Sequence, residues 1–271
     1  MTTAIVTDST TSLAPELRER PDVRVVPLTF HFGPDETYLD KVDMSNAEFY
    51  ERLADSDEFP TTSQPPAGAF VEAYESLSVY DDVLVLTLSG KVSGTYESAV
   101  AAAEMVDRPV EVLDTRSAEM GSGLILLEAL KVIDEGGEFR DARRAAEAAI
   151  RRCSILFAVG TLQYLAKSGR IGRAQRMVGT ALDIRPVLAL EDGEVVPHKR
   201  ARGRKRQMAA LVEQLQPAVE AGSSLYFGHI DAPEAVSELA AALGVEQERV
   251  AEIGGVVGCH VGPGAYGVAY L

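Results

Sequence analysis

Short apolar runs alternate with helical patterns through the first 160 residues of this 271-residue chain. The apolar runs lie at Ala4–Val6, Val23–Phe30, Val83–Leu88, Val110–Leu113 and Ile155–Val159. The helical patterns cover Ala14–Arg20, Asn46–Ala54, Gly68–Leu77, Gly94–Val106, Gly121–Glu135 and Asp141–Arg152. Uninterrupted apolar runs suit strands that are covered on both faces, and strand–helix alternation suits parallel connections. The sequence therefore predicts an N-terminal α/β/α domain built around a parallel sheet.

The pattern changes after about Val159. Two β-rich runs, Val187–Leu190 and Val195–His198, flank a turn at Glu191-Asp192-Gly193 and predict a hairpin. The later elements are predicted as a helix over Lys205–Ala221, a strand over Ser224–Ile230, a helix over Ala232–Leu243, and strands over Arg249–Ile253 and Tyr266–Tyr270. We therefore predict a two-domain α/β fold, with residues 1–157 in the first domain and a smaller mixed-sheet domain over 158–271.

Composition narrows the class of protein. Hydrophobic residues make up 46% and charged residues 25% of the chain, which is typical of a globular protein. No apolar run approaches the roughly 20 residues of a membrane span, and residues 1–8 lack the basic start of a signal peptide. Cys153 and Cys259 are too few for a disulfide framework. We expect a cytoplasmic protein without stable membrane insertion.

Charge is distributed unevenly. The net charge is −15, yet the segment from Lys167 to Arg206 carries eleven basic and only four acidic side chains. An acidic body argues against nucleic acid as the partner, because phosphate attraction favours basic residues over a whole face. The run His198–Arg206 is better interpreted as a docking patch for an acidic partner. A nucleic-acid arm and a solvated helix start are the alternatives.

Three hydroxyl-rich segments follow predicted strands or precede predicted helices: Asp8–Ser12, Thr61–Pro66 and Ser89–Thr95. Ligands of open α/β sheets usually bind beyond the carboxyl ends of the strands. A helix start attracts anions through its unpaired N–H groups, and hydroxyls can donate to the same anion. Helix capping by Ser and Thr is the alternative. Ser89–Thr95 lacks the ending of a P-loop, and no Gly-x-Gly-x-x-Gly sequence follows the first strand.

Two further clusters contain special backbone residues. Lys167–Arg173 combines two glycines with two arginines that could grip an anion, although a solvated basic loop is the alternative. Gly258–Gly264 surrounds His260 with glycine and proline, which predicts a constrained turn that aims one side chain. A structural histidine is the alternative there. The four histidines show no ligand spacing, so we expect no metal site.

Six short motifs then occur in order along the chain. They are Asp8-Ser9-Thr10, Thr61-Thr62-Ser63-Gln64-Pro65, Ser93-Gly94-Thr95-Tyr96, Gly169-Arg170-Ile171-Gly172, the basic residues from Lys199 to Gly203, and Cys259-His260-Val261-Gly262-Pro263-Gly264. Together they resemble the DegV family of bacterial fatty-acid-binding proteins. The resemblance runs from residue 5 to residue 270, so it spans essentially the whole chain.

The resemblance implies a carrier and not an enzyme. One long-chain fatty acid, such as palmitate or oleate, would lie between the two domains, with no other cofactor. A separate ATP-dependent fatty-acid kinase subunit would phosphorylate the carboxylate, and the acyl-phosphate would enter phospholipid synthesis. The positions carried over for the ligand are Thr62 and Ser93, with Gly94, Ser63, Thr95 and His260 as neighbours. The positions carried over for kinase docking are Arg170, Arg173, Arg202 and Arg204.

The residue chemistry agrees with this implication. Hydroxyls and helix starts can hold a carboxylate without a fully buried salt bridge, whose desolvation is costly. A tail of about 16 carbons gains roughly 0.8 kcal/mol for each buried CH₂. Two other functions fit weaker signals: an enzyme that processes a small carbonyl or ester with His260, and a nucleic-acid-binding regulator that uses Lys199–Arg206.

Overall fold

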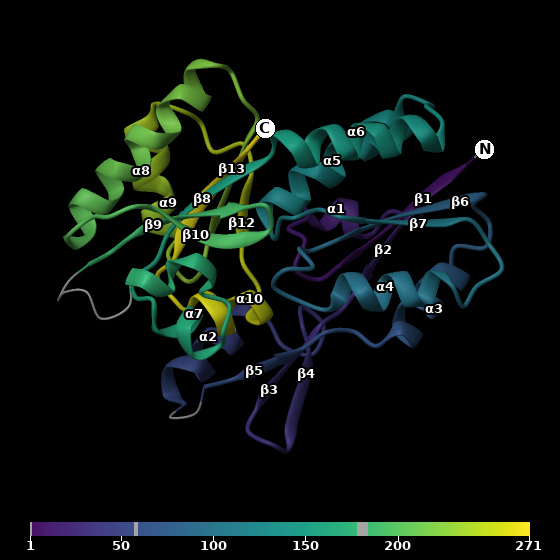
Figure 1. The fold of residues 1–271 in the computed structure, drawn as a ribbon, viewed down its shortest axis with the longest axis horizontal. Helices are drawn as coiled ribbons and strands as arrows, with labels where there is room; N and C mark the ends of the chain where they lie inside the picture. The colour runs from purple at the N-terminus through teal and green to yellow at the C-terminus, as the bar shows by residue number, and fades with distance from the viewer. Residues whose placement is uncertain (1, 57–58, 178–183) are drawn as a thin grey trace.

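The computed structural model describes residues 2–56, 59–177 and 184–271 (Figure 1), so Asp183 of the basic segment lies outside the described residues. Its first sheet contains four parallel strands in the order β2-β1-β6-β7. The strands are β1 (Thr3–Asp8), β2 (Val23–Val26), β6 (Asp82–Thr87) and β7 (Val110–Asp114). The predicted parallel sheet is confirmed.

Helices cover both faces of this sheet. One face packs against α5 (Met120–Asp134) and α6 (Phe139–Arg152), and the other packs against α3 (Ala67–Glu75) and α4 (Thr95–Ala103). Alternate residues of β1 point to opposite faces, so Ile5 joins the first layer while Ala4 and Val6 join the second. A short helix, α1 (Pro15–Arg18), follows β1. The predicted α/β/α arrangement is thus present.

A second sheet has six strands in the order β10-β9-β8-β13-β11-β12. They are β8 (Ser154–Ala158), β9 (Val187–Glu191), β10 (Glu194–Lys199), β11 (Leu225–His229), β12 (Val250–Glu252) and β13 (Tyr266–Tyr270). Only the β11–β12 pair is parallel among these described strands. Helices α8 (Gly203–Glu220) and α9 (Pro233–Leu243) cover one face. The predicted hairpin and mixed sheet are confirmed.

The strand predicted at Ile155–Val159 belongs to this second sheet. We grouped it with the parallel strands, but β8 pairs antiparallel with both β9 and β13. A buried apolar run does not reveal which sheet it enters, since full burial gives the same pattern in both. The boundary predicted after residue 157 falls inside β8. Where the two domains divide stays a prediction.

A third, three-stranded antiparallel sheet was not predicted. It consists of β3 (Thr29–Phe32), β4 (Glu36–Leu39) and β5 (Thr61–Ser63), in the order β4-β3-β5, with α2 (Asn46–Asp55) following β4. The single strand predicted over Val23–Phe30 is therefore wrong. The chain leaves the parallel sheet after Val26, where Pro27 offers no N–H to continue the ladder, and it enters the new sheet at Thr29.

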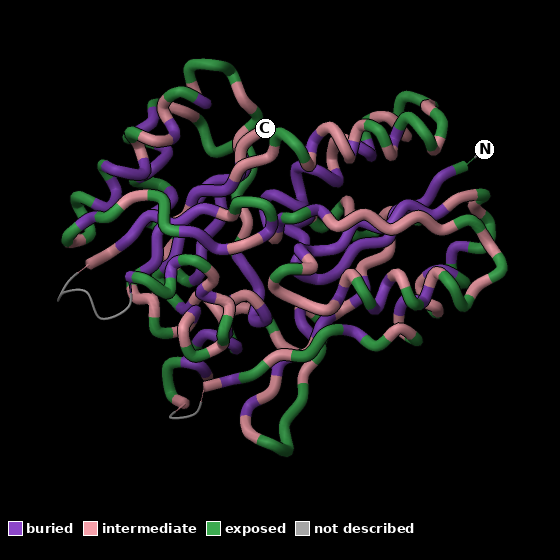
Figure 2. The backbone as a smooth tube through the Cα atoms, viewed as in Figure 1, coloured by how far each residue is buried: buried purple, intermediate pink, exposed green. Residues whose placement is uncertain are grey.

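Short helices lie against the remaining face of the six-stranded sheet. They are α7 (Gln163–Lys167), the 3₁₀ helix Gly172–Met177 and α10 (Gly255–Val261). The turn predicted over Gly258–Gly264 is wrong in its first half, because this segment continues α10 as far as Val261. Positive φ angles at Gly262 and Gly264 then turn the chain into β13. Figure 2 shows buried backbone between the sheets, where one apolar cluster contains Phe30 of β3, Leu124 of α5 and Leu188 of β9.

Candidate functional site

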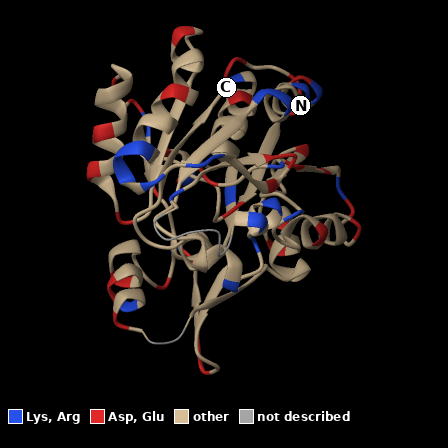
Figure 3. Ribbon diagram, turned by 60° about the vertical axis from the view of Figure 1, so that its left-hand side comes forward, with Lys and Arg blue, Asp and Glu red and all other residues tan. Residues whose placement is uncertain are grey.

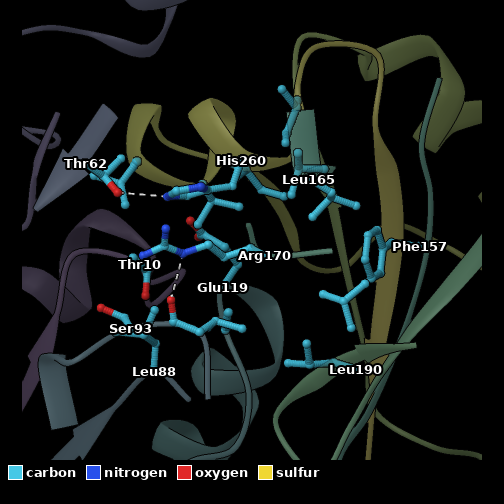
Figure 4. A pocket seen from close by; sticks show the side chains of 18 of the residues that line it. Thr10, Thr62, Leu88, Ser93, Glu119, Phe157, Leu165, Arg170, Leu190 and His260 are labelled. Atoms are coloured by element: carbon cyan, nitrogen blue, oxygen red, sulfur yellow. Dashed lines mark hydrogen bonds between the residues drawn. The ribbon is translucent and has the colours of Figure 1, made fainter. Parts of the chain in front are cut away.

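A cavity of about 400 Å³ lies where the three sheets meet (Figure 4). Its walls come from the segments after β1 and β6, from β5, from the start of α5, from the six-stranded sheet, and from α7 and α10. The residues that line it with polar side chains are Thr10, Thr62, Ser63, Gln64, Ser93, Glu119, Arg170, His260 and Tyr266. Most of the others are apolar, among them Leu88, Ile155, Phe157, Leu165, Leu190, Val195 and Val256.

Thr62 and His260 form one polar contact of the wall. Thr62 lies on β5 and His260 on α10, and Thr62 Oγ1 is 2.8 Å from His260 Nε2. His260 Nδ1 is buried without a hydrogen-bond partner among the described residues. Burial, with a smaller effect of the positive charge on Arg170, lowers the pKa of His260 to about 4. The imidazole is therefore neutral near pH 7, and it offers hydrogen bonding without charge.

The segment that precedes α4 forms the neighbouring wall. Ser93 Oγ lies 2.8 Å from Thr95 Oγ1, which is completely buried beneath it. A Cβ atom on Gly94 would come within 2.1 Å of Gln64 Oε1, so a larger residue here would force Gln64 to move. Because Ser93 and Gly94 line the cavity and Thr95 does not, Thr95 supports the Ser93 hydroxyl from behind.

Arg170 lies in the cavity wall and is held by backbone carbonyls. Its Nε donates to Val92 O at 3.1 Å, and its Nη1 donates to Ser168 O at 2.8 Å. The first bond ties the guanidinium to the segment that carries Ser93. We predicted Arg170 as a docking residue. Its position among the lining residues puts one positive charge beside the hydroxyls, in an otherwise mostly uncharged wall.

The structure thus brings together most of the residues predicted for the ligand. Thr62, Ser63, Ser93, Gly94 and His260 line one cavity although they are spread over almost 200 positions of the chain. Their functional roles stay predictions.

The other predicted docking residues lie outside this cavity. Arg173 is paired with Glu191 at 3.1 Å and Glu194 at 3.5 Å, and Arg204 is paired with Glu238 at 2.7 Å. Arg202 is exposed immediately before α8, where Lys and Arg gather (Figure 3). We name these three exposed arginines, none of which lines the cavity, the basic surface.

Sequence reasoning missed Glu119 as a cavity residue. Glu119 precedes α5, is 4% exposed, and accepts a hydrogen bond from Ser12 Oγ at 2.7 Å. Burial raises its pKa to about 7. No sequence signal pointed to it, because an acidic residue at a helix start is usually a solvated one. Thr10 and Gln64 also line the cavity, and both belong to the motifs that carry the family resemblance.

The DegV family model matches residues 2–271. The chain belongs to the DegV family. The predicted resemblance is therefore confirmed over essentially the whole sequence. Among the described residues, no group of three or more His, Cys, Asp or Glu side chains is arranged to hold a metal ion. No helix in the described ranges has the length and apolarity needed to cross a membrane.

Solved structures of fatty-acid-binding proteins are similar to this chain in fold and length. A fatty-acid-binding DegV protein of Thermus thermophilus is 37% identical, with a TM-score of 0.89, and the match covers 100% of this chain and 99% of that one. DegV of Bacillus subtilis, a fatty-acid-binding protein, is 32% identical, with a TM-score of 0.89 and the same coverage. A stearic-acid-binding protein of Eubacterium ventriosum is 27% identical, with a TM-score of 0.90, over 100% and 98% of the chains. The two-domain α/β fold is thus shared with proteins that bind fatty acids.

Proposed function

We propose that this chain binds one long-chain fatty acid in the cavity, with the carboxylate beside Thr62, Ser93 and His260. The observation that carries the proposal is the composition of the wall, which gathers neutral hydrogen-bonding groups in one part and apolar side chains in the rest. A fatty acid has the same division into a small polar head and a long apolar tail. Fatty-acid binding by the three similar proteins supports a fatty acid as the ligand.

Neutral groups of the cavity wall can hold the carboxylate head of the ligand. The hydroxyls of Thr62 and Ser93 can each donate to a carboxylate oxygen. Their present partners, His260 and Thr95, can act as donor or acceptor, so these hydroxyls are able to turn toward a ligand. His260 stays uncharged because of its low pKa, so the carboxylate does not form a buried ion pair with it. Arg170 supplies a positive charge close by while its guanidinium remains bound to carbonyls. The bound carboxylate would thus keep its nucleophilic oxygens.

The six-stranded sheet supplies apolar side chains that can contact the tail of the ligand. Ile155, Phe157, Leu190 and Val195 contribute apolar side chains to the wall from β8, β9 and β10. Each buried CH₂ of a tail contributes roughly 0.8 kcal/mol, so about 16 carbons outweigh the polar contacts of the head. A volume of about 400 Å³ lies within the range of small-molecule cavities. Palmitate and oleate are the ligands that we propose.

We further propose that the protein presents this carboxylate to a separate ATP-dependent kinase subunit, in the cytoplasm, and performs no catalysis itself. Arg173, Arg202 and Arg204 would form the docking surface, together with Arg170 at the cavity. The acyl-phosphate produced would feed phospholipid synthesis. The basic surface supports this idea because it belongs to the one strongly basic segment of an acidic protein.

Native mass spectrometry of the protein expressed in bacteria tests the first proposal. We expect a co-purified acid of about 250–300 Da, the mass of a tail of this length with its carboxyl group. A delipidated sample should recover the same mass shift after palmitate or oleate is added. A spectrum that stays at the mass of the bare chain after both additions would contradict the proposal.

A further inference from the structure

A buried charged cluster includes the cavity residue Glu119. Lys41, which follows β4, places its Nζ 3.6 Å from Glu119 Oε2 and 2.6 Å from the carbonyl oxygen of Ser9. The two charged side chains are only 11% and 5% exposed. Glu119 Oε1 has no hydrogen-bond partner among the described residues. A buried pair with one unpartnered oxygen is sensitive to any change in the charge of either member.

The backbone at both residues is also unusual. Lys41 has a φ of 61° and Glu119 a φ of 46°, in the region that favours glycine. Such conformations persist in other residues only where the surroundings hold them. Lys41 is held by the carbonyl of Ser9, and Glu119 is held through Ser12 Oγ and by its amide, which donates to Thr10 O at 2.6 Å. Both side chains are thereby directed into the same buried space.

The cluster reaches the helix that carries His260. Asp40 Oδ1 accepts a hydrogen bond of 3.3 Å from the amide of Val256, in the first turn of α10. Gly254 packs so closely that a Cβ atom there would lie 2.5 Å from Lys41 Cε. The start of α10 therefore rests on Asp40 and Lys41. The same helix lines the cavity with Val256, Val257 and His260.

The titratable groups that face Glu119 come from several elements. Asp8 lies at the end of β1, Asp40 and Lys41 lie after β4, Tyr50 lies on α2, and Tyr226 lies on β11. Cys259 of α10 faces the same space through its interaction with Asp40 and Tyr50. Burial raises the pKa values of Asp8, both tyrosines and Cys259, and Lys41 is the cation that acts on Glu119. Ionisation of Glu119 therefore decides whether Lys41 has an ionised partner on the α5 side.

We propose that the Lys41–Glu119 pair is a positioning device for the cavity, which holds the start of α10 and so keeps His260 and its helix closed over the bound ligand. This inference rests on the proposed fatty-acid function. When Glu119 is ionised, its attraction for Lys41 keeps the lysine side chain packed beneath Gly254. A neutral Glu119 leaves Lys41 bound to the Ser9 carbonyl alone, which loosens the support of α10. Because the pKa of Glu119 is raised to about 7, ligand release should depend on pH near neutrality.

Stopped-flow release of cis-parinarate into excess phosphatidylcholine vesicles tests the proposal at pH 6 and pH 8. In the unmodified protein we expect faster release at pH 6, by about five- to tenfold, since Glu119 is then largely protonated and uncharged and no longer pairs with the charged Lys41. Glu119→Gln should release at the fast rate at both pH values. Lys41→Gln should do the same, and the double variant should be no faster than either single variant.

Glu111→Gln is the matched control, because Glu111 pairs with Arg143 at 2.8 Å and neither residue lines the cavity or the neighbouring pocket that contains Lys41. It should keep the pH dependence of the unmodified protein. A pH dependence that survives in Glu119→Gln would overturn the inference, and if that variant does not fold, the same result in Lys41→Gln would do so. Failure of the unmodified protein to bind cis-parinarate or palmitate would instead count against the proposed function itself.

Discussion

The cavity wall and the basic surface differ in the charge and the burial of their polar side chains. Thr62 and His260 are neutral, partly buried groups, and the pKa of the imidazole is depressed to about 4, although Arg170 and Glu119 add charged groups to the same wall. At Arg173, Arg202 and Arg204 the groups are charged and exposed, and two of the three are paired with glutamates. An interior can hold an anion through neutral donors at a low desolvation cost, whereas a surface can use full charges to guide a partner.

This difference matches the division that the sequence motifs predicted. They assigned the ligand to hydroxyl-rich segments and kinase docking to arginines of the basic segment. In the structure, only Arg170 of the four predicted docking arginines lines the cavity. Under the proposed function, the hydroxyls and the imidazole bind the ligand, and the exterior arginines dock the partner.

The largest expected effect is on phosphorylation. Reversing both exterior charges, as Arg202→Glu with Arg204→Glu, should abolish acyl-phosphate formation by the kinase subunit, a loss of about 100-fold or more, because each reversal turns attraction into repulsion. Fatty-acid binding should be unchanged. Phosphorylation with the purified kinase and binding by native mass spectrometry measure the two effects. A loss of lipid binding in this variant would mean that the two regions are not separate.

The next effect concerns the stability of the interior. The pKa of His260 is about 4 in the folded protein and 6.5 in the unfolded chain, so the unfolded state binds a proton first as pH falls. The contribution to the free energy of unfolding is complete above pH 6.5 and falls by about 3 kcal/mol by pH 4. His260→Gln should lack this part of the acid dependence. Urea unfolding of both proteins at several pH values measures it, and identical profiles would contradict a buried neutral imidazole.

Removing single hydroxyls should have a smaller effect on ligand affinity. Thr62→Ala and Ser93→Ala should each weaken fatty-acid binding by about 1–3 kcal/mol, the cost of leaving a polar group of the ligand unpaired. Isothermal titration with palmitate measures the loss. Thr95→Ser keeps a hydroxyl at a buried position and is the matched control. Unchanged affinity in both alanine variants would move the head group elsewhere in the cavity.

The smallest effect is expected at the exterior. Arg173→Ala should change palmitate affinity by less than about twofold, because its ion pairs with Glu191 and Glu194 are exposed and such pairs contribute little. A larger change would show that the basic surface reaches the ligand.

Much of the fold could be predicted because burial leaves a direct pattern. The runs around Ala4–Val6 and Val83–Leu88 are apolar on consecutive positions, and both form central strands of the parallel sheet. The three-stranded sheet could not be predicted in this way, since β4 is polar and mostly exposed and β5 has only three residues. A short polar strand looks like a loop until its partner is known.

The candidate site shows the same limit. Motifs located Thr62, Ser93 and His260, because special residues cluster at each of them, but they did not show that α10 extends to Val261. The family resemblance gave Arg170 a docking role, and an arginine in a glycine-rich segment gives no sign of which side it faces. No motif marked Glu119, because its proposed role depends on a contact with Lys41, which lies 78 positions earlier in the chain.

The most direct test of the central claim is a crystal structure with palmitate bound. We predict one fatty acid in the cavity, with a carboxylate oxygen about 3 Å from Thr62 Oγ1 or Ser93 Oγ. The tail should run toward Phe157 and Leu190 of the six-stranded sheet. A carboxylate that lies among the apolar residues of β8 and β9, or palmitate bound outside the cavity, would contradict the account.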